Sequence, residues 1–261
     1  IEVRAKIAVL SCGSIHTPAF LLKQKLCNSS GQVSRNLTIH PASRTAAFFD
    51  EPIYGWKGVP QGYYVDEYAG EGIMLEGAHG PPNIIAPFLP FTGSRFKKYL
   101  SDIKHLAVFG VMVSDTSTGS VRLAPWGDEP LIFYSLNQND ARRLVKGMAL
   151  VASIFLAAGA KVVLPGISEY PEVRTKAEIA NLRQVSIKPS EIEMAAFHPL
   201  GTCRMGEDPK RSVVNSYLKA HDMENLYIVD GSPFPTSTVI NPQETIMAFA
   251  HRTAEHIANI K

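Results

Sequence analysis

The most informative candidate for acid–base chemistry is a histidine in a loop rich in Gly and Pro. The loop spans residues 197–206 and reads FHPLGTCRMG. Histidine can accept a proton in an acid–base reaction because its unperturbed pKa lies near neutral pH. Functional side chains are also common on loops that a scaffold holds in place. His198 is therefore our candidate catalytic base.

Two later stretches lend weight to this histidine. The apolar run 226–229 predicts a short strand, which ends in Asp230 and Gly231. Asn241 and Pro242 then open a predicted helix, since Asn is a good N-cap and Pro is favoured at the first helical position. A helix N-terminus presents free N–H groups and about half a positive charge, so it can stabilise an anion. Taken alone, the same pattern also describes a well-capped surface helix.

Together these stretches resemble the glucose–methanol–choline (GMC) oxidoreductase family. The main matches are residues 198–206, 225–232 with 235–236, and 241–246; weaker ones are 8–18, 32–37 and 40–41. The resemblance implies FAD-dependent oxidation of a CH–OH group in an alcohol, sugar or sterol-like substrate, by hydride transfer to the flavin. The protein would supply orientation and electrostatics, while the flavin supplies the redox chemistry.

The resemblance also implies roles for particular residues. His198 is the expected base, and Asn241 occupies the second catalytic position, where the family has histidine or asparagine. Because an amide cannot take the proton, the mechanism would depend on His198 alone. The other histidines, His40 among them, are expected to be ordinary core or surface residues. The expected cofactor-binding residues are Gly13, Asp230, Gly231, Asn241, Pro242 and Thr245.

The family's Gly-x-Gly-x-x-Gly turn, which holds the ADP part of FAD, does not occur in this sequence. We therefore expect the C-terminal portion of a longer enzyme, whose N-terminal FAD-binding segment would be a necessary partner. Alone, these 261 residues are expected to retain FAD weakly or not at all and to be inactive. The missing turn leaves open an alternative, a non-catalytic binding or assembly module derived from the family.

Composition excludes several other classes of protein. A net charge of +2 predicts no nucleic-acid partner, and the most apolar run, 148–160, is too short to span a membrane. Three widely spaced cysteines argue against a disulfide scaffold or a zinc site and slightly favour a soluble, cytoplasmic protein. Each cysteine is expected to be a small buried residue. A metal-dependent hydrolase using His198 and Asp230 would need paired ligands that the sequence lacks. The remaining partners are a small-molecule alcohol and an electron acceptor, which can be oxygen, a quinone or a cytochrome.

The elements that must position these residues predict a mixed α/β and α+β fold. A strand to residue 10, a Gly-rich turn and a helix from 16 to 26 are typical of a buried parallel strand in an α/β layer. Residues 44–137 predict a mostly antiparallel sheet, with hairpin turns at 117–120 and 125–128. Further helices are expected at 139–158, capped by Asn139 or Asp140, at 172–184 and at 242–257. We expect residues 1–41 and 196–261 to form the later part of an FAD-binding domain, and 42–195 the substrate-binding domain.

Overall fold

The computed structural model describes residues 2–184 and 186–260. The chain divides into two compact units. Unit 1 comprises Ile1–His40, Asp115–Leu136 and Ala196–Lys261, and unit 2 comprises Pro41–Ser114 and Asn137–Ala195. This division differs from the expected one at residues 115–136, which belong with the two ends of the chain.

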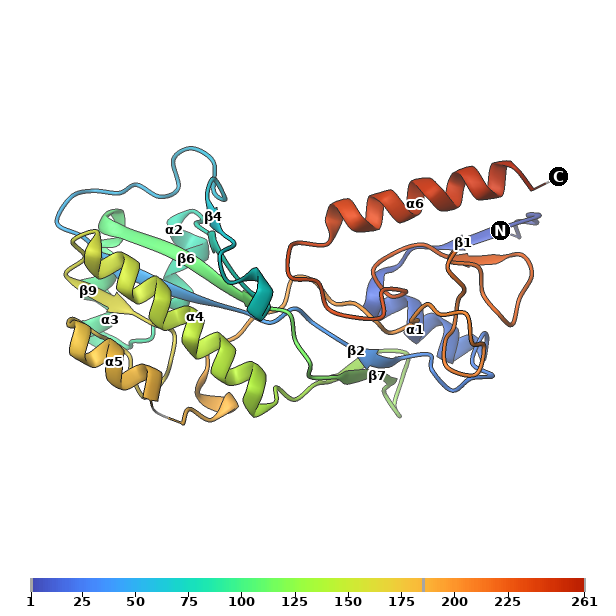
Figure 1. Cartoon of the computed structure of the whole chain (residues 1–261), viewed down its shortest axis with the longest axis horizontal. Helices are drawn as coiled ribbons and strands as arrows, with labels where there is room; N and C mark the ends of the chain where they lie inside the picture. The colour runs from blue at the N-terminus through green and yellow to red at the C-terminus, as the bar shows by residue number, and fades with distance from the viewer. Residues whose placement is uncertain (1, 185, 261) are drawn as a thin grey trace. The chain divides into compact units, whose positions relative to one another are not determined.

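Unit 1 begins with a parallel pair of strands. β1 (Ala8–Leu10) pairs with β10 (Leu226–Ile228), and α1 (Gly13–Gln24) follows β1 directly (Figure 1). The parallel pairing is confirmed, but the expected burial of β1 is wrong. Ala8 and Val9 are exposed whereas β10 is buried throughout, because residues 218–220 form backbone hydrogen bonds with the other edge of β10, whereas β10 is the only described strand that pairs with β1.

A small antiparallel sheet brings the middle of the sequence into unit 1. Its order is β2 (Arg35–Leu37), β7 (Gly119–Leu123) and β8 (Pro130–Phe133). The turn at 125–128 joins β7 to β8, as expected. The expected hairpin turn at 117–120 is wrong, because the strands on either side of it belong to different sheets. Leu37 packs with Val121, and this core explains why residues 115–136 join unit 1.

Unit 2 contains the mostly antiparallel sheet that the sequence predicts. Its strands lie in the order β4-β5-β6-β3-β9, and every pairing is antiparallel. The strands are β3 (Ala42–Phe48), β4 (Tyr64–Val65), β5 (Ile73–Gly77), β6 (Leu106–Val113) and β9 (Val162–Leu164). Short 3₁₀ turns lie at Ala69–Glu71, Ala86–Phe88, Ile103–His105 and Pro189–Glu191.

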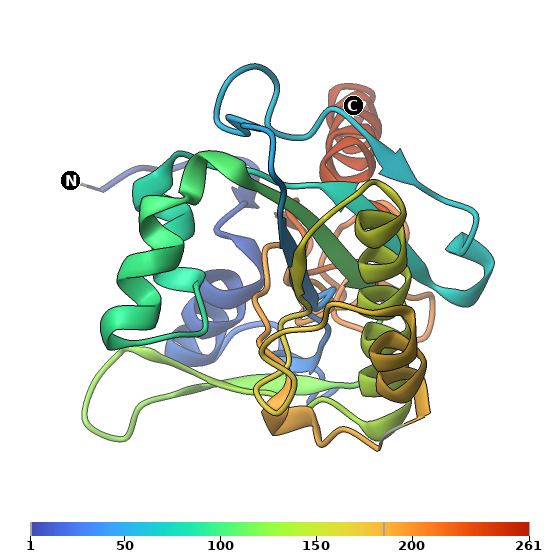
Figure 2. The same cartoon turned by 90° about the vertical axis from the view of Figure 1, so that its left-hand side faces the viewer.

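Helices cover both faces of this sheet (Figure 2). On one face lies α4 (Gln138–Ala157), with α5 (Lys176–Gln184) packed against it; on the other lie α2 (Pro82–Ile85) and α3 (Gly93–Ser101). Successive side chains of β6 point to opposite faces of the sheet and so pack against both helix layers. Val108 packs toward α2 and α3, while Phe109 contacts Phe155 of α4. The sequence did not predict α2 or α3.

The first turn of α4 shows how local chemistry sets a helix boundary. The Asn137 side chain accepts a hydrogen bond from the Asp140 backbone N–H at 2.8 Å, so Asn137 is the cap and the expected caps, Asn139 and Asp140, are wrong. Gly159, with a φ of +94°, ends the helix as expected. None of the described helices combines the length and the apolar character that a membrane span requires.

Candidate active site

The histidine loop is fixed by a close approach of two backbones within unit 1. Thr38 and Leu200 exchange backbone hydrogen bonds of 3.0 and 2.8 Å. Gly201 adopts a φ of +90°, and a Cβ at this position would lie 2.2 Å from the Asn36 carbonyl oxygen. Only glycine accepts both this conformation and this approach. The loop is therefore docked against residues 36–40.

Asp230 holds together the residues that pack against the other side of this loop, where the Ser14 hydroxyl donates a hydrogen bond to the Pro199 carbonyl. Its buried carboxylate accepts hydrogen bonds from the Gly13 N–H at 2.9 Å and the Thr17 hydroxyl at 2.5 Å. It also accepts bonds from the N–H and hydroxyl of Ser232, at 2.7 and 2.6 Å. A Cβ on Gly231 would meet Leu200 at 3.0 Å, so glycine keeps this strand end close to the loop. The structure thus brings three predicted residues, Gly13, Asp230 and Gly231, together beneath the histidine loop.

The docked loop places His198 against a second histidine, His40. Their Nδ1 atoms lie 3.0 Å apart, and the ring planes are tilted by 34°. His40 is 0% exposed, whereas His198 is half-buried. Sequence reasoning missed His40, because a single histidine is more often a core or surface residue. The one available signal was its place in the weaker family match at 32–37 and 40–41.

A buried carboxylate from the middle of the sequence holds His40 in place. The two oxygens of Asp115 accept hydrogen bonds from the backbone N–H groups of His40 at 3.1 Å and Ile39 at 3.2 Å. The Tyr134 hydroxyl also donates to Asp115, at 2.8 Å. This clamp stabilises a left-handed backbone at His40, with a φ of +49°, which a non-glycine residue seldom adopts. The orientation of the His40 ring therefore depends on Asp115.

Burial keeps both histidines neutral. Burial and, to a smaller extent, the neighbouring His198 lower the pKa of His40 to about 4, although the Val239 backbone opposes these effects. Burial also lowers the pKa of His198. A histidine must be unprotonated to accept a proton, so at neutral pH His198 is in the form that a general base requires.

Two of the three cysteines are too buried to compete as nucleophiles. All three are free; Cys27 and Cys203 are buried as expected, but Cys12 is exposed. Burial raises the pKa of Cys27 to about 11 and raises that of Cys203 as well, so both remain thiols at neutral pH. Across the part of the chain that the structure describes, no cluster of His, Cys, Asp or Glu could hold a metal ion.

The last helix, α6 (Gln243–Ala258), starts one residue later than the sequence predicts. Pro242 lies at the cap position, and no described side chain caps the helix, so the expected capping by Asn241 is wrong. Asn241 is half-buried and Thr245 is exposed. Between Asn241 and His198, both described, there is no hydrogen bond. The first N–H groups of α6 therefore stay available to an acceptor outside this helix.

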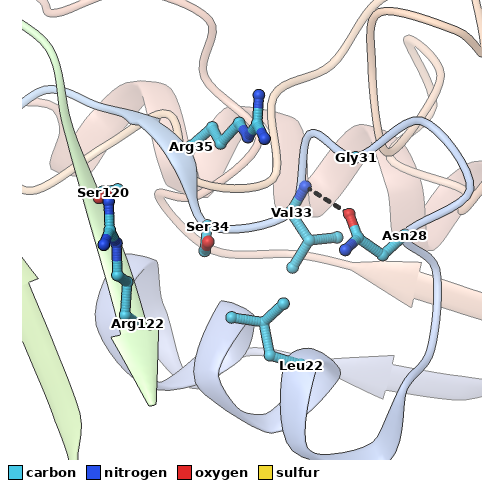
Figure 3. A pocket seen from close by; sticks show the side chains of 8 residues that line it. All are labelled: Leu22, Asn28, Gly31, Val33, Ser34, Arg35, Ser120 and Arg122. Atoms are coloured by element: carbon cyan, nitrogen blue, oxygen red, sulfur yellow. Dashed lines mark hydrogen bonds between the residues drawn. The ribbon is translucent and has the colours of Figure 1, made fainter. Parts of the chain in front are cut away.

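A pocket of about 400 Å³ in unit 1 lies elsewhere (Figure 3). Its polar lining includes Arg35, which follows the loop after α1, and Arg122, which β7 carries. Asn28 accepts a hydrogen bond from the Val33 N–H at 3.1 Å and so shapes one wall. None of the predicted site residues lines this pocket, so it is not the place where His198 would meet a substrate.

Comparison with known proteins decides the family. The family model described as GMC oxidoreductase matches residues 115–250, about half of the chain. The chain belongs to the GMC oxidoreductase family. GMC oxidoreductases are FAD-dependent.

The relatives of this GMC chain are longer than the chain itself. It is 30% identical over 257 residues to an uncharacterized GMC-type oxidoreductase of Mycobacterium tuberculosis, covering 98% of this chain and 40% of the relative. It is 26% identical to the long-chain-alcohol oxidase FAO4A of Arabidopsis thaliana, covering 99% of this chain and 38% of that protein. Among solved structures, pyridoxine 4-oxidase from Mesorbium loti shares the fold, with a TM-score of 0.67 and 20% identity. The match covers 100% of this chain and 53% of that protein. The chain thus spans about two fifths of the two curated relatives and about half of the solved structure.

Proposed function

We propose that this chain carries the catalytic base of an enzyme that oxidises a CH–OH group with FAD. The observation that carries the proposal is the state of His198. Its pKa is lowered by burial, one ring nitrogen faces His40, and its loop is fixed by Gly201 and by hydrogen bonds with Ser14. A neutral, oriented imidazole in a loop that the protein fixes on two sides meets the requirements of a general base.

The proposed chemistry gives the chain's residues a limited set of tasks. The substrate hydroxyl donates its proton to His198, and as the C–H bond breaks the carbon–oxygen bond becomes a carbonyl. FAD, when bound, supplies the acceptor for the hydride. Asn241 would orient the same hydroxyl as a neutral hydrogen-bonding group. Since an amide does not accept the proton, His198 performs that step alone.

The residues near α6 fit the anionic end of a flavin. The helix has free N–H groups in its first turn, no described side-chain cap, and the partial positive charge of a helix N-terminus. Asn241, Pro242 and Thr245 would border such a group. Asp230 and Gly13 engage each other, so any role of theirs at the cofactor would be to hold the backbone at Gly231 in place.

The substrate we propose is a small-molecule alcohol. The relatives named above act, by their names, on long-chain alcohols and on pyridoxine, and both carry a CH–OH group. The electron acceptor is tested separately from the donor. An alcohol panel on the full-length protein, run side by side with oxygen and with an artificial acceptor, would identify both.

The decisive experiment is His198→Ala in the full-length protein. Loss of a general base is expected to lower turnover by roughly 10²- to 10⁴-fold, while the absorbance spectrum of bound flavin stays unchanged. His251→Ala is a matched control, because His251 is an exposed histidine on α6 whose side chain faces Glu255. Turnover at the parental rate in His198→Ala would show that the base has been assigned to the wrong residue.

A further inference from the structure

We infer that His40 is a positioning residue for His198: it accepts the Nδ1–H of His198 and so leaves Nε2 of His198 as the basic nitrogen. The contact that carries this inference is the 3.0 Å separation of the two Nδ1 atoms. The inference rests on the proposed function, since it concerns how the proposed base is kept in its working tautomer.

The contact requires one shared proton. A neutral imidazole has one nitrogen that donates and one that accepts. If both Nδ1 atoms carried protons, two donors would face each other, and if neither did, two lone pairs would. One ring must therefore donate to the other. The nitrogen of His198 that stays free to accept a substrate proton depends on which ring donates.

Only one of the two arrangements allows His198 to act as a base through Nε2. If His40 donated, the proton of His198 would lie on Nε2, and that nitrogen could accept nothing. If His198 donates through Nδ1, its Nε2 keeps a lone pair and His40 carries its own proton on Nε2. The proposed function, in which Nε2 of His198 accepts the substrate proton, therefore selects the second arrangement.

The surroundings of His40 suit a positioning residue and not a second base. Its ring is 0% exposed, and its Nε2 is buried without a well-aligned hydrogen bond to any described residue. Asp115 fixes the backbone on which the ring is mounted. When His198 takes a proton, the bond from its Nδ1–H to the neutral His40 ring becomes charge-assisted and stronger. His40 thus stabilises the product of the proton transfer without touching the substrate.

The test compares two substitutions in the full-length protein. His40→Leu removes the acceptor, whereas His40→Asn keeps an amide oxygen near the position of Nδ1. His40→Leu is expected to lower kcat by roughly 10- to 100-fold, as for loss of a hydrogen bond to a charged group, with a much smaller change in KM. His40→Asn is expected to restore most of kcat. His221→Leu, which removes another hydrogen-bonded histidine of unit 1, serves as the control.

A second measurement is independent of turnover. In protein labelled with ¹⁵N-histidine, the imidazole nitrogen shifts report which ring nitrogen carries the proton, and His198→Ala identifies the signals of His198. We expect the proton of His198 on Nδ1 in the parental protein. This result does not require either His40 variant to fold.

The outcomes separate this inference from the proposed function. A His198 proton on Nε2, or a folded His40→Leu variant with parental kcat, overturns the positioning role even if His198→Ala is inactive. If His40→Asn folds and is as slow as His40→Leu, the acceptor role is likewise wrong. Parental turnover in His198→Ala removes the proposed function, while the nitrogen shifts still decide the tautomer.

Discussion

The two halves of the expected catalytic site are built in opposite ways. Around His198, each supporting group is buried and hydrogen-bonded: Asp230 beneath the loop, and Asp115 behind His40. At the start of α6 the described residues are mainly exposed, no side chain caps the helix, and Thr253 is its one buried residue. The position of His198 depends on long-range hydrogen bonds. The proposed role of the α6 start depends only on where the helix N–H groups point.

This difference teaches where the chain is sensitive to mutation. A proton acceptor needs a defined tautomer and a defined direction, which only neighbouring polar groups can impose. Stabilisation of an anion by a helix N-terminus depends on backbone N–H groups and needs no particular side chain. Substitutions around His198 should therefore have large effects on stability, and substitutions at the start of α6 should have small ones.

The largest effect is expected for Asp230→Ala. Removing the carboxylate leaves four donors on Gly13, Thr17 and Ser232 unpaired, three of them buried, at roughly 4 kcal/mol of unfolding free energy. Urea unfolding measures this. Asp222→Ala is the control, because that exposed carboxylate bonds to Ser29 on the surface and should cost less than about 1 kcal/mol. Equal losses of unfolding free energy in both variants would show that the buried carboxylate contributes no more to stability than the exposed one.

Acid should lower the free energy of unfolding through the protonation of His40. Its pKa in the folded protein is about 4, below the ordinary 6.5, so on acidification the unfolded chain binds the proton first. Stability that is present above pH 6.5 is therefore lost between 6.5 and 4, on the order of 3 kcal/mol. Urea unfolding at several pH values should show a steeper loss in the parental protein than in His40→Asn. Identical slopes would mean that His40 titrates normally.

A smaller loss is expected for Gly201→Ala. The substitution forces a side chain into a φ of +90° and against the Asn36 carbonyl, costing about 2 kcal/mol. Gly127→Ala provides the control, since a Cβ there meets nothing within 4 Å. Thermal unfolding of both variants measures the difference, and similar melting temperatures would show that the loop yields without cost.

The smallest effect is expected at the start of α6. Asn241→Ala should change the unfolding free energy by less than about 0.5 kcal/mol, because the asparagine does not cap the helix. Asn137→Ala should cost about 1 kcal/mol, since that side chain does cap α4. A larger loss for Asn241→Ala in urea unfolding would show that this residue holds the helix after all.

The sequence predicted the elements whose signals are local. β6 appears where a continuous apolar run predicts it, and α4 and α6 follow their helical periodicity to within one or two residues. The short helix α2 was missed because four residues cannot show a period. The hairpin turn at 117–120 was misassigned because its Gly and Ser residues fit a turn, whereas long-range pairing of β7 with β2 decides the topology.

The same limit applies to the site. His198 could be proposed because it lies in an ordered series of motifs along the sequence. His40 could not be assigned to it, since 158 residues separate the two rings and nothing local indicates their contact. Asp115 is also invisible to pattern reasoning, because its partners are backbone N–H groups 75 and 76 residues away. The surroundings of His198 are therefore set by the fold and not by the motif alone.

The sequence segments that form the two units alternate along the chain, and this order matters for protein engineering. His40 ends the first segment of unit 1, Asp115 begins the second, and His198 is the third residue of the last. Unit 2 thus consists of two sequence segments, 41–114 and 137–195, whose ends lie close in sequence to these residues. Recombination that trades both segments between relatives would leave all three residues in their own unit. Related proteins can therefore vary unit 2 while keeping His40, Asp115 and His198 together.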